Sequence, residues 1–184
     1  MLKKVLIILI TFTLILFFVN CKNNSSTENL NEDQELTEGN GFNNIAFDFT
    51  EKDENGKDFT LSSFKGKIIL LVFSTEWCGP CNSEASKLES LYAKYKARGF
   101  EIVQVMFQNM DGNPSDKEDL KRWIDTYKLS FKVLNDPDSS TVNKYNVSSI
   151  PLNLIIDKNF VIKYRATGFY ETAIENKIND LLNQ

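Results

Sequence analysis

Residues 67–74 hold the feature that most constrains the fold, an unbroken apolar run that reads Ile-Ile-Leu-Leu-Val-Phe from Ile68 to Phe73. Successive side chains of a strand point to opposite faces of a sheet, so a run of this kind predicts a strand that is buried on both faces. Each face of the sheet then needs a covering layer. We therefore expect a central sheet with other elements packed on both sides.

The segments around this run alternate between strand and helix patterns. Asn55-Gly56 between two short extended segments is a strong signal for a β-hairpin ahead of the run. Apolar residues recur at helical spacing after it, and Gly99 ends that helix. These patterns predict an α/β domain with a mixed central sheet flanked by helices. The expected strands are 46–50, 58–61, 67–74, 100–107, 133–134, 152–156 and 161–167, the expected helices are 80–98, 114–127, 139–145 and 171–182, and the expected domain is 45–184.

The first 21 residues have the layout of a secretory signal peptide. Two lysines precede an apolar run of 15 residues at 5–19, which is shorter than the roughly 20 residues of a membrane-spanning helix. The run ends at Cys21 and resembles a bacterial lipobox, in which the cysteine is lipidated, although Asn20 stands where a small residue is usual. We expect a lipid-anchored Cys21, and the alternative is an uncleaved N-terminal anchor. Both place the remaining chain in the bacterial cell envelope, outside the cytoplasmic membrane.

Residues 22–44 are predicted to form a flexible tether. They contain seven asparagines and five acids, with only Leu30, Leu36 and Phe42 to bury, so burial cannot offset the entropy of ordering. The five acids and one lysine of this segment account for most of the net charge of −4. Because the chain has no broad basic excess, we expect no nucleic-acid partner.

The chain contains no histidine. This excludes Ser-His-Asp and Cys-His catalysis, histidine metal sites and histidine pH switches. Its three cysteines are too few for a Cys₄ zinc or iron–sulfur site within one chain. We therefore expect no resident metal and no cofactor, and a chemistry that uses cysteine, carboxylates, lysine or the backbone.

Cys78 and Cys81 lie between the buried strand and the start of the next helix. The free N–H groups and positive dipole end of a helix stabilise a thiolate, and Pro80 fits the first helical turn. We expect Cys78 to be the exposed nucleophile that attacks a substrate disulfide, and Cys81 to be the shielded thiol that resolves the mixed disulfide. The alternatives are a structural disulfide, which stabilises little across so short a loop, and half of a metal site, which would need two further ligands.

Trp77-Cys78-Gly79-Pro80-Cys81 is the active-site motif of thioredoxins. Together with Leu-Ser-Ser-Phe-Lys-Gly-Lys at 61–67 and the strand that follows, it resembles the TlpA-like (ResA-like) branch, membrane-tethered thioredoxins of the bacterial cell envelope. The resemblance covers about residues 45–184 and implies a thioredoxin fold with an N-terminal β-hairpin and a central insert. It implies reduction of disulfides in envelope proteins, with apocytochrome c among the family's clients, and a membrane thiol conduit as electron donor. We expect a monomer.

Further positions match the family's active site. The loop at 149–151 matches the cis-proline loop, which implies that Pro151 faces the cysteine pair and that the Ile150 backbone pairs with the substrate chain. Glu84 matches an acidic residue that would transfer protons, and the alternative is an acid favoured by the helix dipole. Gly168 matches a glycine beside the active-site face. The expected substrate-binding residues are Trp77, Gly79, Pro80, Ile150 and Pro151.

Two positions depart from thioredoxin itself. Val72 stands where thioredoxin has a buried aspartate, so Glu84 is the nearest substitute for a proton carrier. Ser86 replaces a helix-kinking proline, and we expect a straighter helix with unchanged chemistry.

Two other functions are compatible with the motif. Thr75-Glu76-Trp77-Cys78 supplies the Thr-x-x-Cys of a peroxiredoxin-type peroxidase, but Leu71 replaces the expected proline and arginines are few. The cysteine pair could instead bind Cu(I), which thiolates suit, although relatives of that kind add a histidine. Peroxide consumption and metal titration distinguish these alternatives from disulfide reduction.

Overall fold

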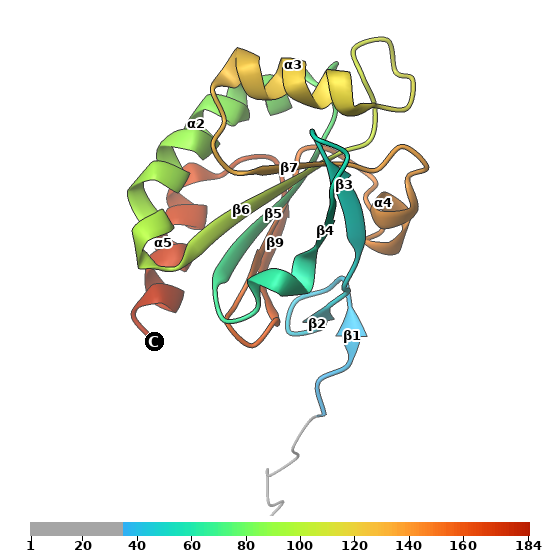
Figure 1. The fold of residues 1–184 in the computed structure, drawn as a ribbon. Helices are drawn as coiled ribbons and strands as arrows, with labels where there is room; N and C mark the ends of the chain where they lie inside the picture. The colour runs from blue at the N-terminus through green and yellow to red at the C-terminus, as the bar shows by residue number, and fades with distance from the viewer. Residues whose placement is uncertain (1–34) are drawn as a thin grey trace, which may run out of the picture. The chain divides into compact units, whose positions relative to one another are not determined.

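The structure, a computed structural model, describes residues 35–184 and contains a seven-stranded sheet in the order β4-β3-β7-β6-β5-β8-β9. β5, β6 and β7 are parallel, whereas β3, β8 and β9 each pair antiparallel with a neighbour (Figure 1). The predicted mixed sheet is confirmed, with the apolar run as an interior strand. The strands are β3 (Thr50–Asp53), β4 (Asp58–Thr60), β5 (Ile68–Ser74), β6 (Phe100–Met106), β7 (Lys132–Asn135), β8 (Leu152–Ile156) and β9 (Ile162–Thr167).

Strand β5 divides the core into two layers, because its side chains alternate between the two faces of the sheet. Ile68, Leu70 and Val72 belong to one apolar cluster, and Ile69, Leu71 and Phe73 to the other. All seven residues of β5 are buried. The continuous apolar run thus serves both layers at once.

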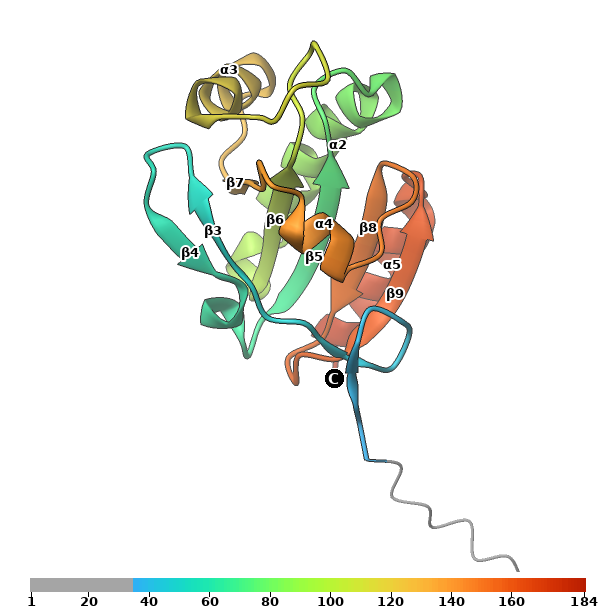
Figure 2. The same ribbon diagram turned by 90° about the vertical axis from the view of Figure 1, so that its right-hand side faces the viewer.

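The helices cover the two faces unequally. Those on the side of Val72 are α2 (Gly79–Tyr95), α3 (Lys117–Tyr127) and α5 (Glu171–Leu182), all of which contribute to the first cluster. The short α4 (Ser140–Lys144) contributes to the second cluster on the opposite face, and Figure 2 shows it in front of the sheet with α5 behind. Helix α2 continues as a 3₁₀ turn and ends at Gly99, whose φ of 89° suits a residue without Cβ. Ser86 causes no break in α2.

Helix α3 begins later than the sequence pattern predicted, at Lys117 instead of Pro114. Pro114 pairs with Gln108 in an isolated β-bridge, and Asp116 caps the helix by accepting hydrogen bonds from the backbone N–H groups of Glu118 and Asp119. An aspartate at the N-cap satisfies donors that have no partner within the helix. The prediction treated a proline as the helix start and missed this stronger cap.

The first strand of the predicted hairpin is also displaced. The hairpin exists as β3 and β4 around the Asn55-Gly56 turn, but β3 begins at Thr50, near the end of the predicted 46–50 strand. Phe47 and Phe49 instead pack edge-on against the ring of Tyr145. The apolar residues that suggested a strand at 46–50 therefore serve these aromatic contacts instead of a strand.

The folded part of the chain begins before the predicted boundary at residue 45. Strand β1 (Glu38–Gly39) pairs in parallel with β2 (Ile45–Ala46), and the compact unit starts at Leu36. Backbone hydrogen bonds tie this segment to the domain, with the Asn43 N–H donating to Ile162 O at 2.8 Å. Hydrogen bonding, which an apolar count does not register, joins residues 36–44 to the domain. The predicted signal segment with Cys21, and the tether up to residue 34, lie outside the described residues.

Within residues 35–184, no helix combines the length and the apolar character needed to cross a membrane.

Candidate active site

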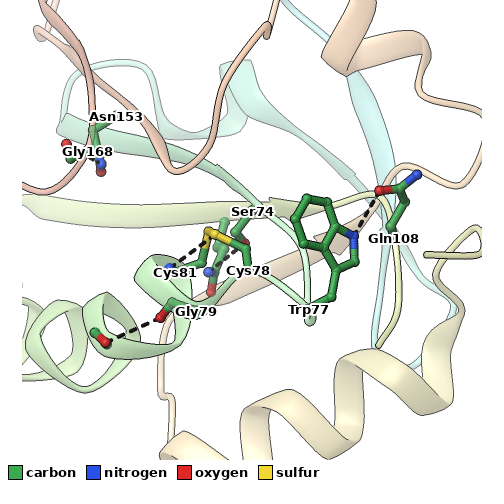
Figure 3. The surroundings of a disulfide bond; sticks show 10 residues. Ser74, Trp77, Cys78, Gly79, Cys81, Gln108, Asn153 and Gly168 are labelled. Atoms are coloured by element: carbon green, nitrogen blue, oxygen red, sulfur yellow. Dashed lines mark hydrogen bonds between the residues drawn. A yellow bond between two sulfur atoms is a disulfide. The ribbon is translucent and has the colours of Figure 1, made fainter. Parts of the chain in front are cut away.

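Cys78 and Cys81 are joined by a disulfide where strand β5 leads into helix α2 (Figure 3). Cys78 is the N-cap residue of α2, and its Sγ accepts a hydrogen bond from the Cys81 N–H at 3.2 Å. Pro80 lies in the first turn, as predicted from its missing N–H. The sulfur of Cys78 therefore sits among the free N–H groups at the positive end of a helix.

The expectation of an exposed Cys78 is wrong for this disulfide form. Cys78 is 3% exposed and Cys81 is 1% exposed. The Cys78 sulfur is turned inward by its bond to Cys81 and by its place over the helix terminus. The neighbouring Trp77, Gly79 and Pro80 carry the exposed surface instead.

The loop before β8 lies beside the first turns of α2. The Ile150-Pro151 peptide bond is cis, the form that the resemblance implied. Gly168, at the end of β9, donates its N–H to Pro151 O at 2.7 Å and so joins this loop to the last strand. Pro151 and the start of α2 share a cavity of about 220 Å³, which is lined by Pro80, Ser83, Glu84, Lys87, Pro151 and Phe169.

Glu84 lies one helical turn after Cys81 and is buried, with 2% of its surface exposed. Neither of its carboxyl oxygens has a hydrogen-bond partner among the described residues. Burial raises the pKa of the Glu84 carboxyl from its ordinary 4.5 to about 7, while the Asn153 amide and the Lys87 ammonium act in the opposite direction. A carboxyl in this condition exchanges protons near neutral pH.

Val72 is apolar as the sequence indicates, but both of its cross-strand neighbours are buried amides. Gln104 of β6 and Asn153 of β8 stand opposite Val72 in the sheet register. Both polar atoms of the Gln104 amide have a partner, because its Nε2–H donates to Ser74 Oγ at 2.8 Å and its Oε1 accepts from Trp123 at 3.0 Å. Sequence reasoning missed both residues, because strand register cannot be read from one chain.

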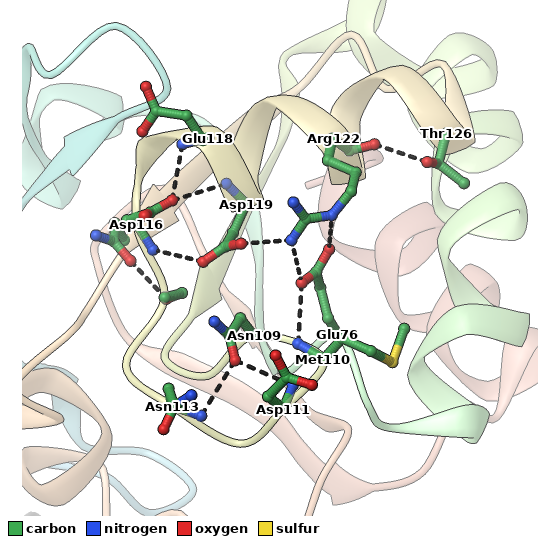
Figure 4. Close-up of polar contacts among 12 residues, drawn as sticks. Glu76, Asn109, Met110, Asp111, Asn113, Asp116, Glu118, Asp119, Arg122 and Thr126 are labelled. Carbon is green, nitrogen blue, oxygen red and sulfur yellow. Dashed lines mark hydrogen bonds and ion pairs between the residues drawn. The ribbon is translucent and has the colours of Figure 1, made fainter.

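Glu76, two residues before Cys78, is a buried residue that sequence reasoning did not assign. Its carboxylate forms a two-pronged ion pair with Arg122 of α3, at 2.9 Å to Nε and 2.7 Å to Nη2 (Figure 4). The same carboxylate accepts the Met110 N–H at 3.0 Å, and Asp119 also contacts Arg122. These contacts tie the active-site loop to the segment between β6 and α3. An acid beside the motif was visible, but its partner is 46 residues away in the sequence.

Trp77 forms the exposed rim of the site. It is 49% exposed, and its Nε1–H donates to Gln108 Oε1 at 3.0 Å. The Glu76 N–H donates to Gln108 O at 3.1 Å, so Gln108 holds two consecutive residues of the loop. The indole is fixed in direction while its face stays open to a partner.

Comparison with known proteins gives consistent matches over this region. The chain is 34% identical over 123 residues to the thiol-disulfide oxidoreductase ResA of Geobacillus kaustophilus, with 67% of each chain covered. Among solved structures, a candidate thiol:disulfide interchange protein DsbE from Chlorobium tepidum is 29% identical, with 80% of this chain and 99% of that chain covered and a TM-score of 0.68. The thioredoxin domain of a thiol-disulfide oxidoreductase from Bacteroides vulgatus is 23% identical, covers 78% of this chain and 99% of its own, and has a TM-score of 0.67.

These matches confirm the predicted thioredoxin fold and the resemblance to ResA-like proteins. The AhpC/TSA family matches residues 42–165, a span that takes in the buried strand, the cysteine motif and the cis-proline loop. The chain belongs to the AhpC/TSA family.

Proposed function

We propose that this chain, a thiol–disulfide oxidoreductase, reduces disulfides of proteins in the bacterial cell envelope by dithiol exchange. The observation that carries the proposal is the Cys78–Cys81 disulfide at the N-terminus of α2, beside the cis-Pro151 loop. A dithiol that can close within one helical turn can donate two electrons and end as this disulfide. The relatives named ResA support the same chemistry.

The reaction begins with the reduced form of the pair. The Cys78 thiolate attacks one sulfur of a client disulfide, a mixed disulfide forms, and the other client sulfur leaves as a thiolate that takes up a proton. The Cys81 N–H and the helix dipole stabilise the attacking thiolate. Cys81 then loses its proton and attacks the Cys78 sulfur, which releases the second client thiol and restores the disulfide. A membrane thiol donor returns two electrons to the pair.

The second step needs a group that accepts the Cys81 proton. Glu84 is one helical turn away on α2, and burial raises the pKa of its carboxyl to about 7. In its ionised form Glu84 accepts that proton, directly or through one water. No histidine is available for this task anywhere in the chain.

The client is bound as an extended segment on the exposed rim. Trp77, Gly79 and Pro80 supply the surface around the cysteine pair, and the Ile150 backbone pairs with the client chain. The half-buried Ile150 contacts both apolar clusters and is held in place beside Pro151. A client disulfide near the surface of its own protein would fit this arrangement.

A peroxidase is the second candidate, because Thr75 lies three residues before Cys78. The contacts of the three arginines favour disulfide exchange instead. Arg122 pairs with Glu76, Arg98 donates to Asn179 and Asn183, and Arg165 donates to backbone carbonyls. None of these contacts directs an arginine to the Cys78 sulfur, where it could activate a peroxide. Peroxide consumption at the rate of disulfide reduction would favour the peroxidase.

Cu(I) delivery is the third candidate, with two thiolates as ligands. The described residues 35–184 hold no group of three or more Cys, Asp or Glu side chains placed to bind a metal ion. Titration of the reduced protein with Cu(I) tests this alternative.

Single cysteine variants test the proposed function. With dithiothreitol as donor and a protein disulfide as client, Cys78→Ser is expected to abolish the acceleration of reduction over dithiothreitol alone, because it removes the attacking thiolate. Cys81→Ser, reduced and then freed of dithiothreitol before the client is added, is expected to accumulate a covalent client complex, seen on non-reducing gels, because the mixed disulfide cannot be resolved. Cys21→Ser is the matched control and should retain full reductase activity. Equal trapping by the Cys78→Ser and Cys81→Ser variants would contradict the assigned order of attack.

The anchor is a separate part of the proposal. We expect the mature chain to begin at a lipidated Cys21, since the apolar run of the signal segment ends there. Labelling of cells with a fatty-acid analogue should tag the wild-type chain and leave Cys21→Ser untagged. A mature N-terminus at another residue would contradict the lipoprotein assignment without affecting the redox proposal.

A further inference from the structure

Asn153 is a buried polar residue that the proposed reaction does not yet use. It is 0% exposed and lies on β8, opposite Val72 of β5 and Ala166 of β9. Its neighbours Leu152 and Leu154 belong to the second apolar cluster, so the alternation of the strand turns Asn153 toward the face that α2 and α5 cover. That face contains the cysteine pair and Glu84.

The amide of Asn153 is only half used. Its Nδ2–H donates to Gly168 O at 3.3 Å, and Figure 3 shows these two residues side by side, whereas its Oδ1 is buried and has no partner among the described residues. Both oxygens of the nearby Glu84 are in the same condition. Buried polar atoms without partners are rare because they lose their bonds to water and gain none in return.

Two such groups on facing elements suggest that each serves the other during the reaction. An amide has two N–H donors and a carbonyl acceptor, while a carboxyl group changes from acceptor to donor when it takes up a proton. We propose that Asn153 is the positioning residue for Glu84, with Nδ2 donating to the ionised carboxylate and Oδ1 accepting from the protonated acid. One amide then holds the proton carrier in both of its states.

The same residue joins Glu84 to the client-binding loop. Gly168 accepts from Asn153 through its carbonyl and donates its N–H to Pro151 O. Asn153 thus stands between the cis-proline loop and the carboxyl group that receives the Cys81 proton. This inference rests on the proposed function, because it gives Asn153 a task in resolution of the mixed disulfide.

The charged and titratable groups around Glu84 come from three elements. The positive charge of Lys87 on α2 lowers the pKa of the Glu84 carboxyl, and Lys87 also pairs with Glu171 of α5 at 3.4 Å. Burial raises the pKa of the Tyr164 phenol on β9, and the negative charge of Glu84 raises it further. Neither residue forms a hydrogen bond with the Glu84 oxygens. The Asn153 amide is the neutral polar side chain that lowers the pKa of the Glu84 carboxyl, and its own carbonyl oxygen is also without a partner among residues 35–184.

The test is the pH profile of resolution. A mixed disulfide between Cys78 and a small fluorescent thiol is formed in advance, and release of that thiol is followed after rapid mixing into buffers of different pH. Asn153→Leu keeps the branched shape of the side chain and removes the amide. We expect resolution to slow about tenfold at neutral pH, as for loss of a hydrogen bond to a charged group. The midpoint of the profile should move to higher pH, since the Asn153 amide lowers the Glu84 pKa. Asn153→Thr keeps a donor and an acceptor and should recover part of the rate.

Two controls separate positioning from general loosening of the core. Gln104→Leu removes the other buried amide beside Val72 and should leave the midpoint unchanged. In a Glu84→Gln background, Asn153→Leu should have no further effect on the midpoint. An unchanged profile for Asn153→Leu, or the same shift in both backgrounds, would overturn the proposal. Failure of the wild-type protein to form a mixed disulfide through Cys78 would instead contradict the proposed function, whatever the Asn153 variants do.

Discussion

Two buried glutamates flank the cysteine pair, and they differ in what surrounds them. Glu76 precedes Cys78 in the active-site loop and is 4% exposed, and Glu84 follows Cys81 on α2 and is 2% exposed. The Glu76 carboxylate accepts three hydrogen bonds, two from Arg122 and one from the Met110 N–H. The Glu84 carboxyl accepts none among the described residues.

The comparison teaches that burial alone does not make a carboxyl group reactive. The Arg122 ion pair compensates for the loss of water around the Glu76 carboxylate. Glu76 therefore serves as a fixed link between the active-site loop and helix α3. At Glu84 burial outweighs the Asn153 amide and the Lys87 charge and raises the pKa of the carboxyl to about 7, which is the property that our proposal assigns to the proton carrier. Glu76 is therefore fixed by an ion pair, and Glu84 is the glutamate to which we assign a part in the chemistry.

The largest effect expected from the difference between Glu76 and Glu84 is on how the free energy of unfolding depends on pH. The Glu84 carboxyl binds its proton more tightly in the folded protein than in the unfolded chain, where its pKa is 4.5. The contribution of Glu84 to the free energy of unfolding is therefore most favourable below about pH 4.5 and declines as the pH rises to about 7. The decline amounts to at most about 3 kcal/mol.

Urea unfolding of the oxidised protein at several pH values between 4.5 and 7.5 measures this slope. Subtraction of the Glu84→Gln profile isolates the Glu84 contribution, because other carboxyl groups titrate alike in both proteins. Glu76→Gln should keep the Glu84 slope. If the free energy of unfolding of the wild type ran parallel to that of Glu84→Gln across this pH range, Glu84 would have no raised pKa and would not differ from Glu76 in this respect.

A smaller effect is expected on the rate of the second chemical step. Glu84→Gln keeps the shape of the side chain and removes its titration, so resolution by Cys81 should slow about 10–100-fold near neutral pH. The pH dependence that Glu84 imposes on resolution should disappear at the same time. The first attack by Cys78 should keep its rate, which is measured as the rate at which the mixed disulfide forms. A slower first attack would mean that Glu84 acts on Cys78 as well.

Much of the fold could be predicted because its signals are local. The run at 67–74 identified a strand buried on both faces, and Asn55-Gly56 identified the hairpin turn. The start of α3 and the join between residues 36–44 and the domain were missed, since both depend on hydrogen bonds that compete with the apolar pattern.

The active site divides along the same line. Cys78, Cys81, Glu84 and Pro151 come from short motifs or fixed spacings, and the structure brings them together around one cavity and one helix terminus. Asn153 and Arg122 are distant in sequence and reach the site through strand register and helix packing. The burial of Cys78 in the disulfide form was not predicted either, because the motif alone does not show how the surrounding chain covers its sulfur.

The smallest expected effect concerns the fixed glutamate. Arg122→Gln removes the guanidinium fork from Glu76 and leaves the Met110 N–H as the partner given by the structure. A charge-assisted hydrogen bond to a buried group is worth about 1.5–3 kcal/mol. The Arg122 side chain is about half exposed, so water replaces part of the interaction, and we expect a loss of about 1–2 kcal/mol in the free energy of unfolding.

Arg122→Lys separates charge from geometry, because lysine keeps the positive charge but cannot reproduce the two parallel hydrogen bonds. Its loss of stability should fall between wild type and Arg122→Gln, as measured by urea unfolding at one pH. Neither variant should move the pH midpoint of the resolution step, since the Glu76–Arg122 pair holds the loop and exchanges no proton with Cys81. A shifted midpoint in Arg122→Gln would mean that a change at Glu76 reaches the proton carrier on the other side of the cysteine pair. The two glutamates would then act as one coupled unit, and the division between a structural and a reactive carboxyl group would fail.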